Sequence, residues 1–338
     1  KVFGPNKKAA IIEGSKIFTR ELLQKYNIPS AEFAHFDNAE KALDYLKQKG
    51  APIVVKADGL AAGKGAIVCE TVEEAEEAIK KIMVDATFGE AGKKVILEEK
   101  LVGEEASFLV FTDGETIKPM VSSQDHKAVF DGDKGPNTGG MGAYSPAPVI
   151  TKELEEEIIE TIMRPTIDAM KKEGREYAGI LYAGLMITKN GPKIIEFNCR
   201  FGDPETQPLL MRLESDLVPI LQSCMDKTLA KQDIKWSEKA ACCVVMASGG
   251  YPGKYEKEKE ILGLNEANAL KDTVVFHAGT KLDGEKVLTN GGRVLGITSL
   301  GNSIKESIEN SYKAVEKISF EKAYFRKDIG QKALNREK

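Results

Sequence analysis

One stretch constrains the fold and chemistry of this 338-residue chain more than any other, Ile194–Glu205. It opens as a strand, because a short apolar run follows the turn signal Asn190-Gly191-Pro192. In extended backbone, the side chains of residues i and i+2 point to the same face. Glu196 and Asn198 are therefore expected to project together, while Phe197 faces the opposite side.

A carboxylate and an amide oxygen on one face, with no His or Cys on that face, suit a hard divalent cation such as Mg²⁺. Arg200 follows where the strand gives way to a Gly-Asp-Pro turn, so metal ligands and a guanidinium would meet at one strand end. Taken alone, the stretch fits a second interpretation equally well, a structural salt bridge between Glu196 and Arg200. Other segments of the chain are needed to distinguish the metal site from the salt bridge.

Composition and charge narrow the class of protein and partner. Of the residues, 42% are hydrophobic and 30% are charged, with a net charge of -4, which is typical of a globular chain of two or three domains. Nucleic acid is not an expected partner, because its phosphates need a basic face. No apolar run is long enough to span a membrane. Cys242 and Cys243 lie in an apolar run, which indicates core thiols in a reducing cytoplasm.

Residues 30–100 have the pattern β-α-β-β-α-β, which predicts a small lid. Between its inner strands, the segment Lys56–Gly65 carries three glycines that permit close approach of the backbone to a ligand. Lys56 and Lys64 indicate phosphate as that ligand. The segment is not a Walker A loop, since Gly65 follows Lys64 and a strand comes next. A flexible hairpin with solvated lysines is the alternative, but a lysine that ends a buried strand needs an anionic partner.

Two further segments of the first hundred residues have open interpretations. Residues 6–27 are predicted to be helical with an interruption at Gly14-Ser15. Lys16 lies beside this interruption and, without further context, is interpreted as a solvated surface lysine. The segment Leu97–Glu105 leaves the lid for the next sheet, and such a hinge is a favoured place for a planar heterocycle. Its glutamates fit a solvated edge as well.

The segment 119–148 is rich in turns, and its polar and glycine content favours a binding loop over disorder. His126 within it reads as a structural histidine. Beyond it, the patterns predict helices at 152–173, 207–225 and 303–317 and strands at 183–188, 241–247, 273–278 and 293–299, with a linker at 226–239.

Together these residues resemble the ATP-grasp enzymes and, within them, the phosphoribosylamine–glycine ligase family. The resemblance covers nearly the whole chain and rests on the following stretches: Glu13–Lys16, Val55–Gly65, Gly103–Phe108, Ser123–Lys127, Gly135–Pro146, Glu196–Glu205, Phe276–Thr280 and Asn290–Val294. It implies an α+β protein with an ATP-grasp fold, in which two subdomains enclose ATP, followed by a smaller C-terminal α+β domain. The expected boundaries are 15–228 for the ATP-grasp domain, with the lid at about 30–100, and 235–338 for the C-terminal domain.

The resemblance also implies an activity. Such a ligase activates glycine with ATP as glycyl phosphate, and 5-phosphoribosylamine then attacks to give glycinamide ribonucleotide, ADP and phosphate. Positioning, Mg²⁺ or Mn²⁺, and lysines should carry most of the catalysis, because a carboxylate must approach a triphosphate of like charge.

By resemblance, each group of candidate residues receives a role. Glu196 and Asn198 are expected to hold the metal. The expected ATP-binding residues are Lys16, Lys56, Gly59, Gly63, Lys64, Gly65, Glu98 and Leu101, with Glu105, or alternatively Glu104, on the ribose. Arg200, Gly202 and Asp203 would orient glycine or its acyl phosphate, with Lys56, Arg200 and Asp203 as the catalytic set. Asp125, Lys127, Gly139 and Gly140 would line the acceptor side.

The family also carries an N-terminal Rossmann-like domain that helps to bind the phosphoribosylamine phosphate. Residues 1–14 are expected to be a residual linker from this missing domain, which predicts weak or absent complete turnover by the chain as it stands. A monomer is expected. Two alternatives stay open, another ATP-grasp ligase with a different carboxylate substrate and a non-catalytic ATP-binding module.

Overall fold

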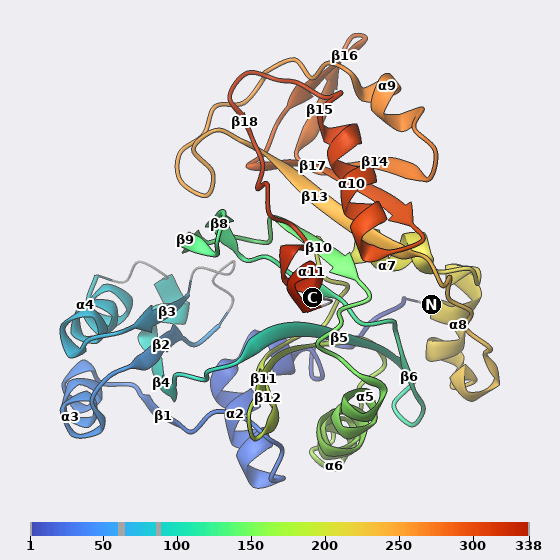
Figure 1. The fold of residues 1–338 in the computed structure, drawn as a ribbon. Coiled ribbons are helices and arrows are strands. Elements are labelled where there is room, and N and C mark those ends of the chain that lie inside the picture. The colour runs from blue at the N-terminus through green and yellow to red at the C-terminus, as the bar shows by residue number, and fades with distance from the viewer. Residues whose placement is uncertain (1, 60–64, 86–88, 337–338) are drawn as a thin grey trace. The chain divides into compact units, whose positions relative to one another are not determined.

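A computed structural model describes residues 2–59, 65–85 and 89–336, shown as a ribbon in Figure 1. The chain forms two compact units, each with its own sheets and helices. Unit 1 comprises Lys1–Pro119, Thr151–Arg200 and Leu221–Lys231. Unit 2 comprises Met120–Ile150, Phe201–Ile220 and Gln232–Lys338.

The lid of unit 1 is a four-stranded antiparallel sheet covered by two helices. In sheet order its strands are β1 (Phe33–Phe36), β4 (Val95–Glu99), β2 (Ile53–Ala57) and β3 (Ala66–Cys69). The helices are α3 (Ala39–Lys49) and α4 (Val72–Met83), and a 3₁₀ turn, η1 (Gly89–Lys93), precedes β4. Asn38 and Thr71 cap the two helices through their side-chain oxygens, and the apolar faces of both close the core of the lid. The predicted β-α-β-β-α-β pattern is confirmed.

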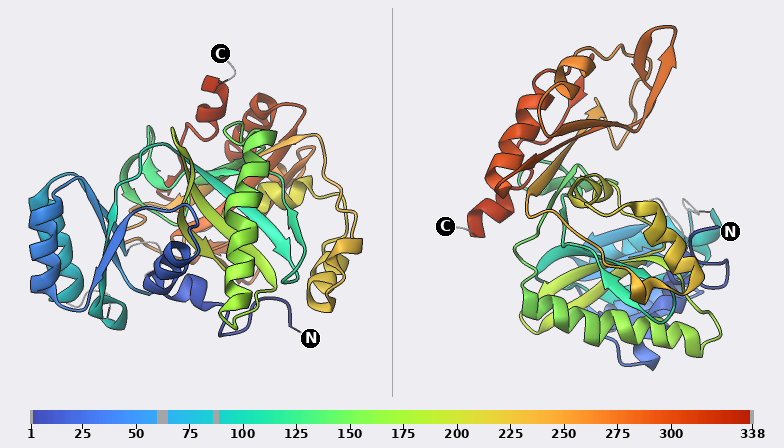
Figure 2. Two further views of the ribbon diagram at one scale, coloured as in Figure 1. Left: turned by 90° about the horizontal axis from the view of Figure 1, so that it is seen from below. Right: turned by 90° about the vertical axis from the view of Figure 1, so that its right-hand side faces the viewer.

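The second sheet of unit 1 is also antiparallel. In sheet order its strands are β12 (Gly191–Asn198), β11 (Gly179–Thr188), β5 (Glu104–Thr112) and β6 (Ile117–Pro119). Figures 1 and 2 show helices on one face of this sheet. The helices of unit 1 outside the lid are α1 (Ile11–Gly14), α2 (Lys16–Lys25), α5 (Lys152–Ile158), the π-helical turn η2 (Ile159–Met163) and α6 (Arg164–Lys172). The helix α8 (Leu217–Asp226) and the turn η3 (Leu229–Lys231) follow later in the chain.

Unit 2 is organised around an antiparallel sheet of six strands. Its path is β14 (Thr273–His277), β17 (Arg293–Gly301), β13 (Ala240–Ser248), β10 (Gly142–Ser145) and β7 (Gln124–Asp125), and β18 (Ala323–Tyr324) pairs with β13. Two hairpins extend from it, β8 (Ala128–Phe130) with β9 (Lys134–Asn137) and β15 (Thr280–Asp283) with β16 (Lys286–Thr289). The helices are α7 (Thr206–Arg212), α9 (Leu264–Asn268), α10 (Ile304–Val315) and α11 (Gln331–Arg336).

The structure corrects two expectations. The segment 119–148 is not an irregular loop, because β7 and β10 join the sheet of unit 2, where Tyr144 pairs with Cys242 of β13. This segment is therefore packed with the C-terminal strands, whereas the predicted domain boundaries, which place it in the ATP-grasp domain, stay a prediction. The helix expected at 207–225 is two helices, α7 and α8, with a break at Leu213. Leu213 is extended and bridges to Trp236.

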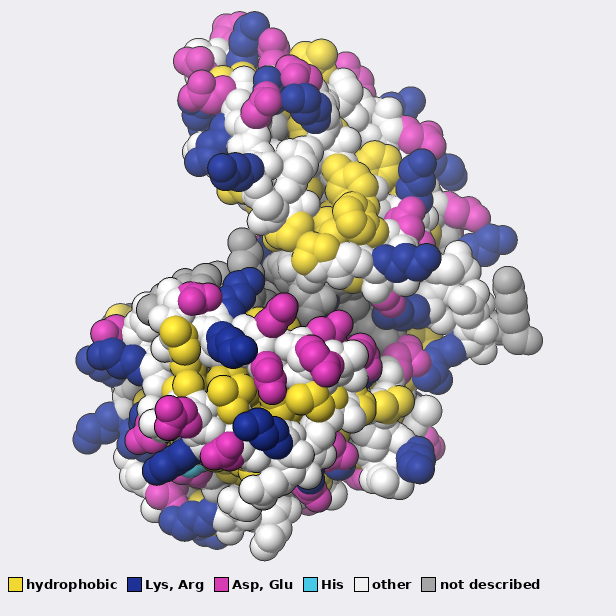
Figure 3. Space-filling model, turned by 90° about the vertical axis from the view of Figure 1, so that its left-hand side faces the viewer, with side chains coloured by type: hydrophobic (Ala, Val, Ile, Leu, Met, Phe, Trp, Pro, Cys, Tyr) yellow, Lys and Arg dark blue, Asp and Glu magenta, His cyan; other side chains and the backbone are white. Residues whose placement is uncertain are grey.

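The charged surface carries both signs. On the face in Figure 3, lysine and arginine side chains of the described residues are interspersed with aspartate and glutamate. Exposed ion pairs occur among the described residues, such as Lys49 with Glu32 at 3.0 Å. Such exposed pairs contribute little to stability. In the part of the chain that the structure describes, no helix has the length and apolar character needed to cross a membrane.

Candidate functional site

The predicted metal strand is β12. Glu196 pairs across the sheet with Gly184 and Asn198 with Tyr182, and both side chains are half-buried. Phe197 between them is only 3% exposed, so it lies on the opposite face. The expected alternation is confirmed, and the carboxylate and the amide share one face.

A β-bulge at Ile195 precedes these two residues. Leu185 of β11 pairs with Ile194 and the next residue, Gly184, pairs with Glu196, so Ile195 is the extra residue. Arg20 of α2 donates from Nη1 to the Ile194 carbonyl at 3.1 Å and from Nη2 to the Ile195 carbonyl at 2.6 Å. The guanidinium thus satisfies carbonyl groups that a bulged strand leaves outside the regular ladder.

The same guanidinium binds the hinge of the lid. Arg20 donates from Nε and Nη2 to the two carboxylate oxygens of Glu98, at 2.6 and 2.8 Å. The Lys56 ammonium lies 2.7 Å from Glu98 Oε2 and also donates to the Ile195 carbonyl at 3.4 Å. All three side chains are at most 7% exposed. A buried triad of two cations and one carboxylate therefore joins α2, the lid and the metal strand.

The charges of this triad act on the pKa of Glu98 and on that of Lys56. Burial by itself raises the pKa of Glu98, but the Lys56 and Arg20 cations more than offset it and hold the pKa at about 2. Burial lowers the pKa of Lys56, and Glu98 opposes that change while Arg20 adds to it. Glu98 is therefore an ionised counter-charge for Lys56 and Arg20 at neutral pH.

The N-terminus of α2 contacts the start of the glycine-rich segment. Lys16 donates from Nζ to the Gly59 carbonyl at 2.7 Å, and Ser15 donates from Oγ to Asp58 Oδ1 at 3.0 Å. The Ile17 amide also donates to Asp58 Oδ1, at 3.1 Å. Lys16 and Gly59, which are 43 residues apart, are thus in contact, and their role as phosphate ligands stays a prediction. The predicted residues Gly63 and Lys64 lie outside the described residues.

Arg200 lies at the end of the metal strand and is exposed. It donates from Nη2 to Asn198 Oδ1 at 3.3 Å, and its Nε lies 4.0 Å from Glu13 Oε1. Glu13 of α1 also accepts from the Cys199 amide at 2.7 Å. Glu13 therefore anchors the strand end that carries Asn198 and Arg200.

Glu196 and Asn198 fit a Mg²⁺ or Mn²⁺ ion by the chemistry of their donors, one carboxylate and one amide oxygen. Within residues 2–59, 65–85 and 89–336, no cluster of three or more His, Cys, Asp or Glu side chains is arranged to hold a metal. Substrate phosphates commonly supply further oxygen ligands to a Mg²⁺ ion that is held by one or two protein side chains.

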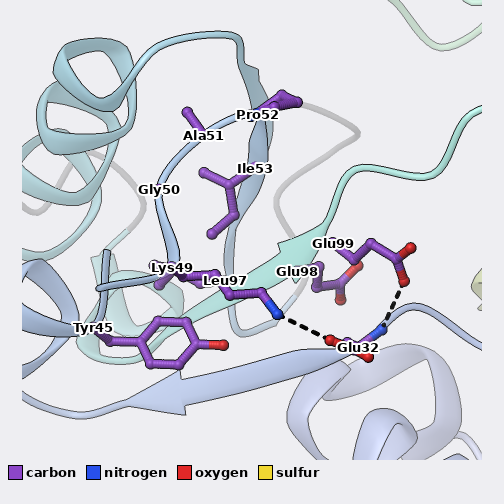
Figure 4. Close-up of a pocket in the computed structure, with 10 residues that line it drawn as sticks. All are labelled: Glu32, Tyr45, Lys49, Gly50, Ala51, Pro52, Ile53, Leu97, Glu98 and Glu99. Carbon is purple, nitrogen blue, oxygen red and sulfur yellow. Dashed lines mark hydrogen bonds and ion pairs between the residues drawn. The ribbon is translucent and has the colours of Figure 1, made fainter. Parts of the chain in front are cut away.

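A cavity of about 260 Å³ in the lid, shown in Figure 4, is not this site. Of the predicted nucleotide-binding residues only Glu98 lines it. Its charged groups are already paired, because Lys49 donates to Glu32 and the Glu32 amide donates to Glu99 Oε2 at 3.3 Å. Leu101 and Glu105 lie away from it, in and after the connection between β4 and β5.

The predicted residue Gly65 lies in unit 1, where its carbonyl accepts from the Ala57 amide at 2.8 Å. The residues predicted for the acceptor side, together with Gly202 and Asp203, lie in unit 2. Asp125 is on β7, and Lys127 precedes the β8–β9 hairpin. Asp125 lies against the Gly139–Gly140 turn, since a Cβ on Gly140 would be 2.8 Å from Asp125 Oδ1. Gly202 and Asp203 precede α7, whose first residue donates from its hydroxyl to the Gly202 carbonyl.

Comparisons with known proteins identify the family. Residues 14–206 match the family described as "Phosphoribosylglycinamide synthetase, ATP-grasp (A) domain", and residues 241–332 match its C domain. Over 337 residues, the chain is 53% identical to a phosphoribosylamine–glycine ligase of Vibrio vulnificus strain YJ016, covering 99% of this chain and 78% of that protein. The chain belongs to the phosphoribosylglycinamide synthetase family.

Solved structures agree with this assignment. A phosphoribosylamine–glycine ligase from Thermotoga maritima superposes with a TM-score of 0.85 at 35% identity, covering 97% of this chain and 81% of that one. The biotin carboxylase domain of Hydrogenobacter thermophilus 2-oxoglutarate carboxylase, solved with MgADP, superposes at 0.73 with 16% identity and covers 95% and 69% of the two chains. The second likeness concerns the fold alone. The α+β ATP-grasp fold predicted from the sequence is confirmed.

Two residues that contact predicted site residues or their strand, Arg20 and Glu13, received no role from the sequence. The signal for Arg20 was its spacing, since it lies one helical turn after Lys16 and so on the same face of α2. Glu13 belongs to the stretch Glu13–Lys16, which carries part of the family resemblance, but the sequence assigned it no role. Both act on residues more than 70 positions away, which no local pattern records.

His126 is a buried structural histidine, as the sequence indicated, with 1% of its surface exposed. Its Nε2 accepts from the Gly330 amide at 3.3 Å, so the proton of the neutral ring is on Nδ1, which lies 3.3 Å from the Gly142 carbonyl. Burial, and then the Arg326 and Lys332 cations, lower its pKa to about 4, against the opposing effect of Asp133 and Asp328.

This shift predicts acid sensitivity of unit 2. The folded-state pKa lies below the ordinary value of about 6.5, so stability from this group is complete above pH 6.5 and is lost as pH falls toward 4, by about 3 kcal/mol in total. Trp236, the chain's one tryptophan, lies in unit 2 and reports urea unfolding there. We expect His126→Gln to flatten the decline between pH 6.5 and 4.5, whereas His277→Gln, which removes an exposed histidine of the same unit, should keep it. Equal slopes in all three proteins would contradict the assignment.

Proposed function

We propose that this chain ligates glycine to 5-phosphoribosylamine with ATP, as a step of purine biosynthesis. Membership of the synthetase family over both of its matched domains supports the activity. The observation that supports the site assignment is that Lys56, a member of the buried triad, binds Glu98 and also donates to the carbonyl of Ile195, one residue before Glu196. The lysine proposed to bind phosphate is therefore in contact with the strand that carries the proposed metal ligands.

The reaction has two steps. A carboxylate oxygen of glycine attacks the γ-phosphorus of ATP, the bond to the β-phosphate oxygen breaks, and ADP leaves, which gives glycyl phosphate. The amine nitrogen of 5-phosphoribosylamine then attacks the carbonyl carbon, phosphate leaves and the nitrogen releases a proton. The first step brings a carboxylate up to a triphosphate of like charge, and the second develops negative charge on the departing phosphate. Positioning and fixed positive charge should therefore supply most of the acceleration.

We assign the nucleotide to unit 1. Lys16, Lys56 and the segment Gly59–Gly65 would bind the phosphates, where ammonium groups and backbone amides offset their charge. Glu98 and the Leu101 backbone would meet adenine, with Glu105 on the ribose. Because Glu98 is bound by Arg20 and Lys56, its main contribution in this assignment is to keep Lys56 in place.

Glu196 and Asn198 would hold Mg²⁺ or Mn²⁺, which when bound offsets phosphate charge and polarises the transferred group. Arg200 would bind the glycine carboxylate or its acyl phosphate, for which a guanidinium is well shaped. Gly202 and Asp203 would complete this side, and Asp125, Lys127, Gly139 and Gly140 would line the acceptor. A monomer in the cytoplasm stays a prediction, to which the five free cysteines add support for a reducing compartment.

One assay distinguishes the proposed ligase from two other functions. It measures ADP release by the chain with Mg-ATP in the presence of different carboxylates. Stimulation by a carboxylate other than glycine would indicate another ATP-grasp ligase. Nucleotide binding without any stimulated turnover would indicate a binding module. The proposed ligase requires stimulation by glycine, and a further rise with freshly prepared 5-phosphoribosylamine measures complete turnover.

Glu196→Ala is the sharpest single test of the metal assignment. We expect glycine-stimulated ADP release to fall by roughly 10²-fold or more, because one of two metal oxygens is removed where charge must be offset. Raising the Mg²⁺ concentration should recover part of the rate. Glu173→Ala, which removes a surface carboxylate paired with Lys25, is the matched control and should leave the rate unchanged. A wild-type rate and metal dependence in Glu196→Ala would remove Glu196 from the site.

A further inference from the structure

Arg293, the first residue of β17, joins three segments of unit 2 that are distant in the sequence. Its Nη1 donates to the carbonyls of Gly139 and Asp203, at 2.7 Å each, and more weakly to that of Gly140 at 3.4 Å. Its Nη2 lies 2.9 Å from Asp203 Oδ2. One guanidinium therefore binds both the turn assigned to the acceptor side and the aspartate assigned to the glycine side.

The backbone of Arg293 is itself held in place. Its carbonyl accepts from the Gly279 amide at 3.0 Å, and the residue pairs with Ala247 of β13. The side chain is 21% exposed, so its stem is largely covered while the guanidinium reaches the turn. The anchor is thus part of the sheet, and the segments it holds are loops.

The turn that Arg293 holds has little free space around it. A Cβ on Gly139 would lie 2.9 Å from the Arg293 guanidinium carbon. Gly140 has φ +113°, and a Cβ there would lie 2.3 Å from Pro204 Cδ. From the other side, the Gly139 amide donates to the Tyr251 hydroxyl at 3.1 Å. The turn is packed between Arg293, Pro204 and Tyr251, so its position depends on where the guanidinium lies.

Asp203 is oriented by the same contact. Its Oδ2 binds Arg293 and its Oδ1 accepts from Gln207 Nε2 at 3.0 Å, although the side chain is 49% exposed. A half-exposed carboxylate without such partners would sample several rotamers. Here both oxygens have donors, so the carboxylate keeps one orientation relative to the Gly139–Gly140 turn.

We propose that Arg293 is a positioning residue that holds the Gly139–Gly140 turn and Asp203 in one arrangement for the acceptor amine. This inference rests on the proposed function, which assigns those residues to the substrates. Arg293 acts through them and need not touch the substrates itself. Lysine cannot replace it, because a single ammonium cannot span two carbonyls and a carboxylate in the fork geometry of a guanidinium.

The test compares Arg293→Lys and Arg293→Ala with the wild-type chain in the ADP-release assay. We expect kcat/KM for 5-phosphoribosylamine to fall by about 10- to 100-fold in both, as for other displacements of about 1 Å at a reacting pair. The dissociation constant for Mg-ATP should stay within about twofold, because the nucleotide residues belong to unit 1. Added guanidinium chloride at millimolar concentration should restore part of the activity of Arg293→Ala and none of Arg293→Lys.

Hydrogen exchange supplies a second readout that does not need turnover. Amides of residues 138–141 should exchange faster in Arg293→Lys, while the strands β13 and β17 keep wild-type protection. Lys286→Gln, which removes a surface cation paired with Glu260 at 2.9 Å in the same unit, is the control for both measurements and should match wild type.

The outcomes separate the two hypotheses. A wild-type chain without glycine-stimulated ADP release would reject the proposed function, and the exchange comparison would still test whether Arg293 holds the turn. An active wild type with unchanged kcat/KM in both Arg293 variants would reject the positioning role alone. Equal losses for every substrate, faster exchange throughout unit 2 and no rescue by guanidinium would show that Arg293 only stabilises the unit.

Discussion

Glu98→Gln is expected to destabilise unit 1 by about 3–5 kcal/mol, the usual cost of removing one partner from a buried ion pair. The side chains of Arg20 and Lys56 are 3% and 7% exposed, and in the variant both cations would remain buried without their counter-charge. The amide of glutamine fills the same volume, so the loss measures charge and not packing. Lys56 is then expected to lose its place, and Mg-ATP affinity should fall with stability.

Hydrogen exchange of the β2 and β4 amides is the appropriate measurement, because Trp236 lies in unit 2 and does not report on unit 1. The neighbouring Glu99 offers a matched control. Its carboxylate is 40% exposed and pairs with Lys193 at 3.4 Å, so Glu99→Gln should change the opening free energy by less than about 0.5 kcal/mol. Equal effects of the two substitutions would show that the triad contributes no special stability.

Arg326→Met is expected to destabilise unit 2 by about 3 kcal/mol. The guanidinium is 1% exposed and makes two bonds of 2.8 Å to Asp328, one of 2.9 Å to Asp133 and one of 3.0 Å to the Ala128 carbonyl. These contacts fasten the C-terminal segment to the β8–β9 hairpin. The expected loss is at the lower end for a buried pair, because Asp328 and Asp133 are 26% and 40% exposed and can be hydrated once unpaired.

Urea unfolding followed by Trp236 fluorescence measures this change in unit 2. Lys327→Met is the matched control, since it removes the exposed cation of the next residue and leaves the backbone bond from Lys327 to Asp131 intact. We expect its midpoint to equal that of wild type. The position of His126 depends on the same segment through Gly330, so Arg326→Met should also raise exchange at residues 125–127. An unchanged midpoint in Arg326→Met would show that the segment is held by its apolar contacts alone.

Local pattern predicted most of the elements that carry the site. The β-α-β-β-α-β pattern predicted for residues 30–100 is present as β1, α3, β2, β3, α4 and β4. Side chains alternate between the two faces of a strand, so Glu196 and Asn198 are expected on one face. They lie on one face of β12. These features depend on a few neighbouring residues, so the sequence contains all the information they need.

Local pattern could not find the contacts that assemble those elements. Arg20 binds Glu98 across 78 positions and the carbonyl of Ile194 across 174, and no period or motif links such residues. The bulge at Ile195 is visible only once β11 and β12 are paired. The strands β7 and β10 were missed because a strand of two to four residues gains its stability from pairing, here with β13, and has almost no pattern of its own.

The sequence by itself determined which chemistry the chain can offer: lysines in a glycine-rich segment, two oxygen ligands on one strand face, and the motifs that match its family. The tertiary structure decided which charged side chains join distant segments of the chain, namely Arg20 in unit 1 and Arg293 and Arg326 in unit 2. The physical reason is that a guanidinium has several donors at the end of a long side chain. It joins whatever acceptors the fold brings within reach, and those acceptors are set by the packing of distant segments.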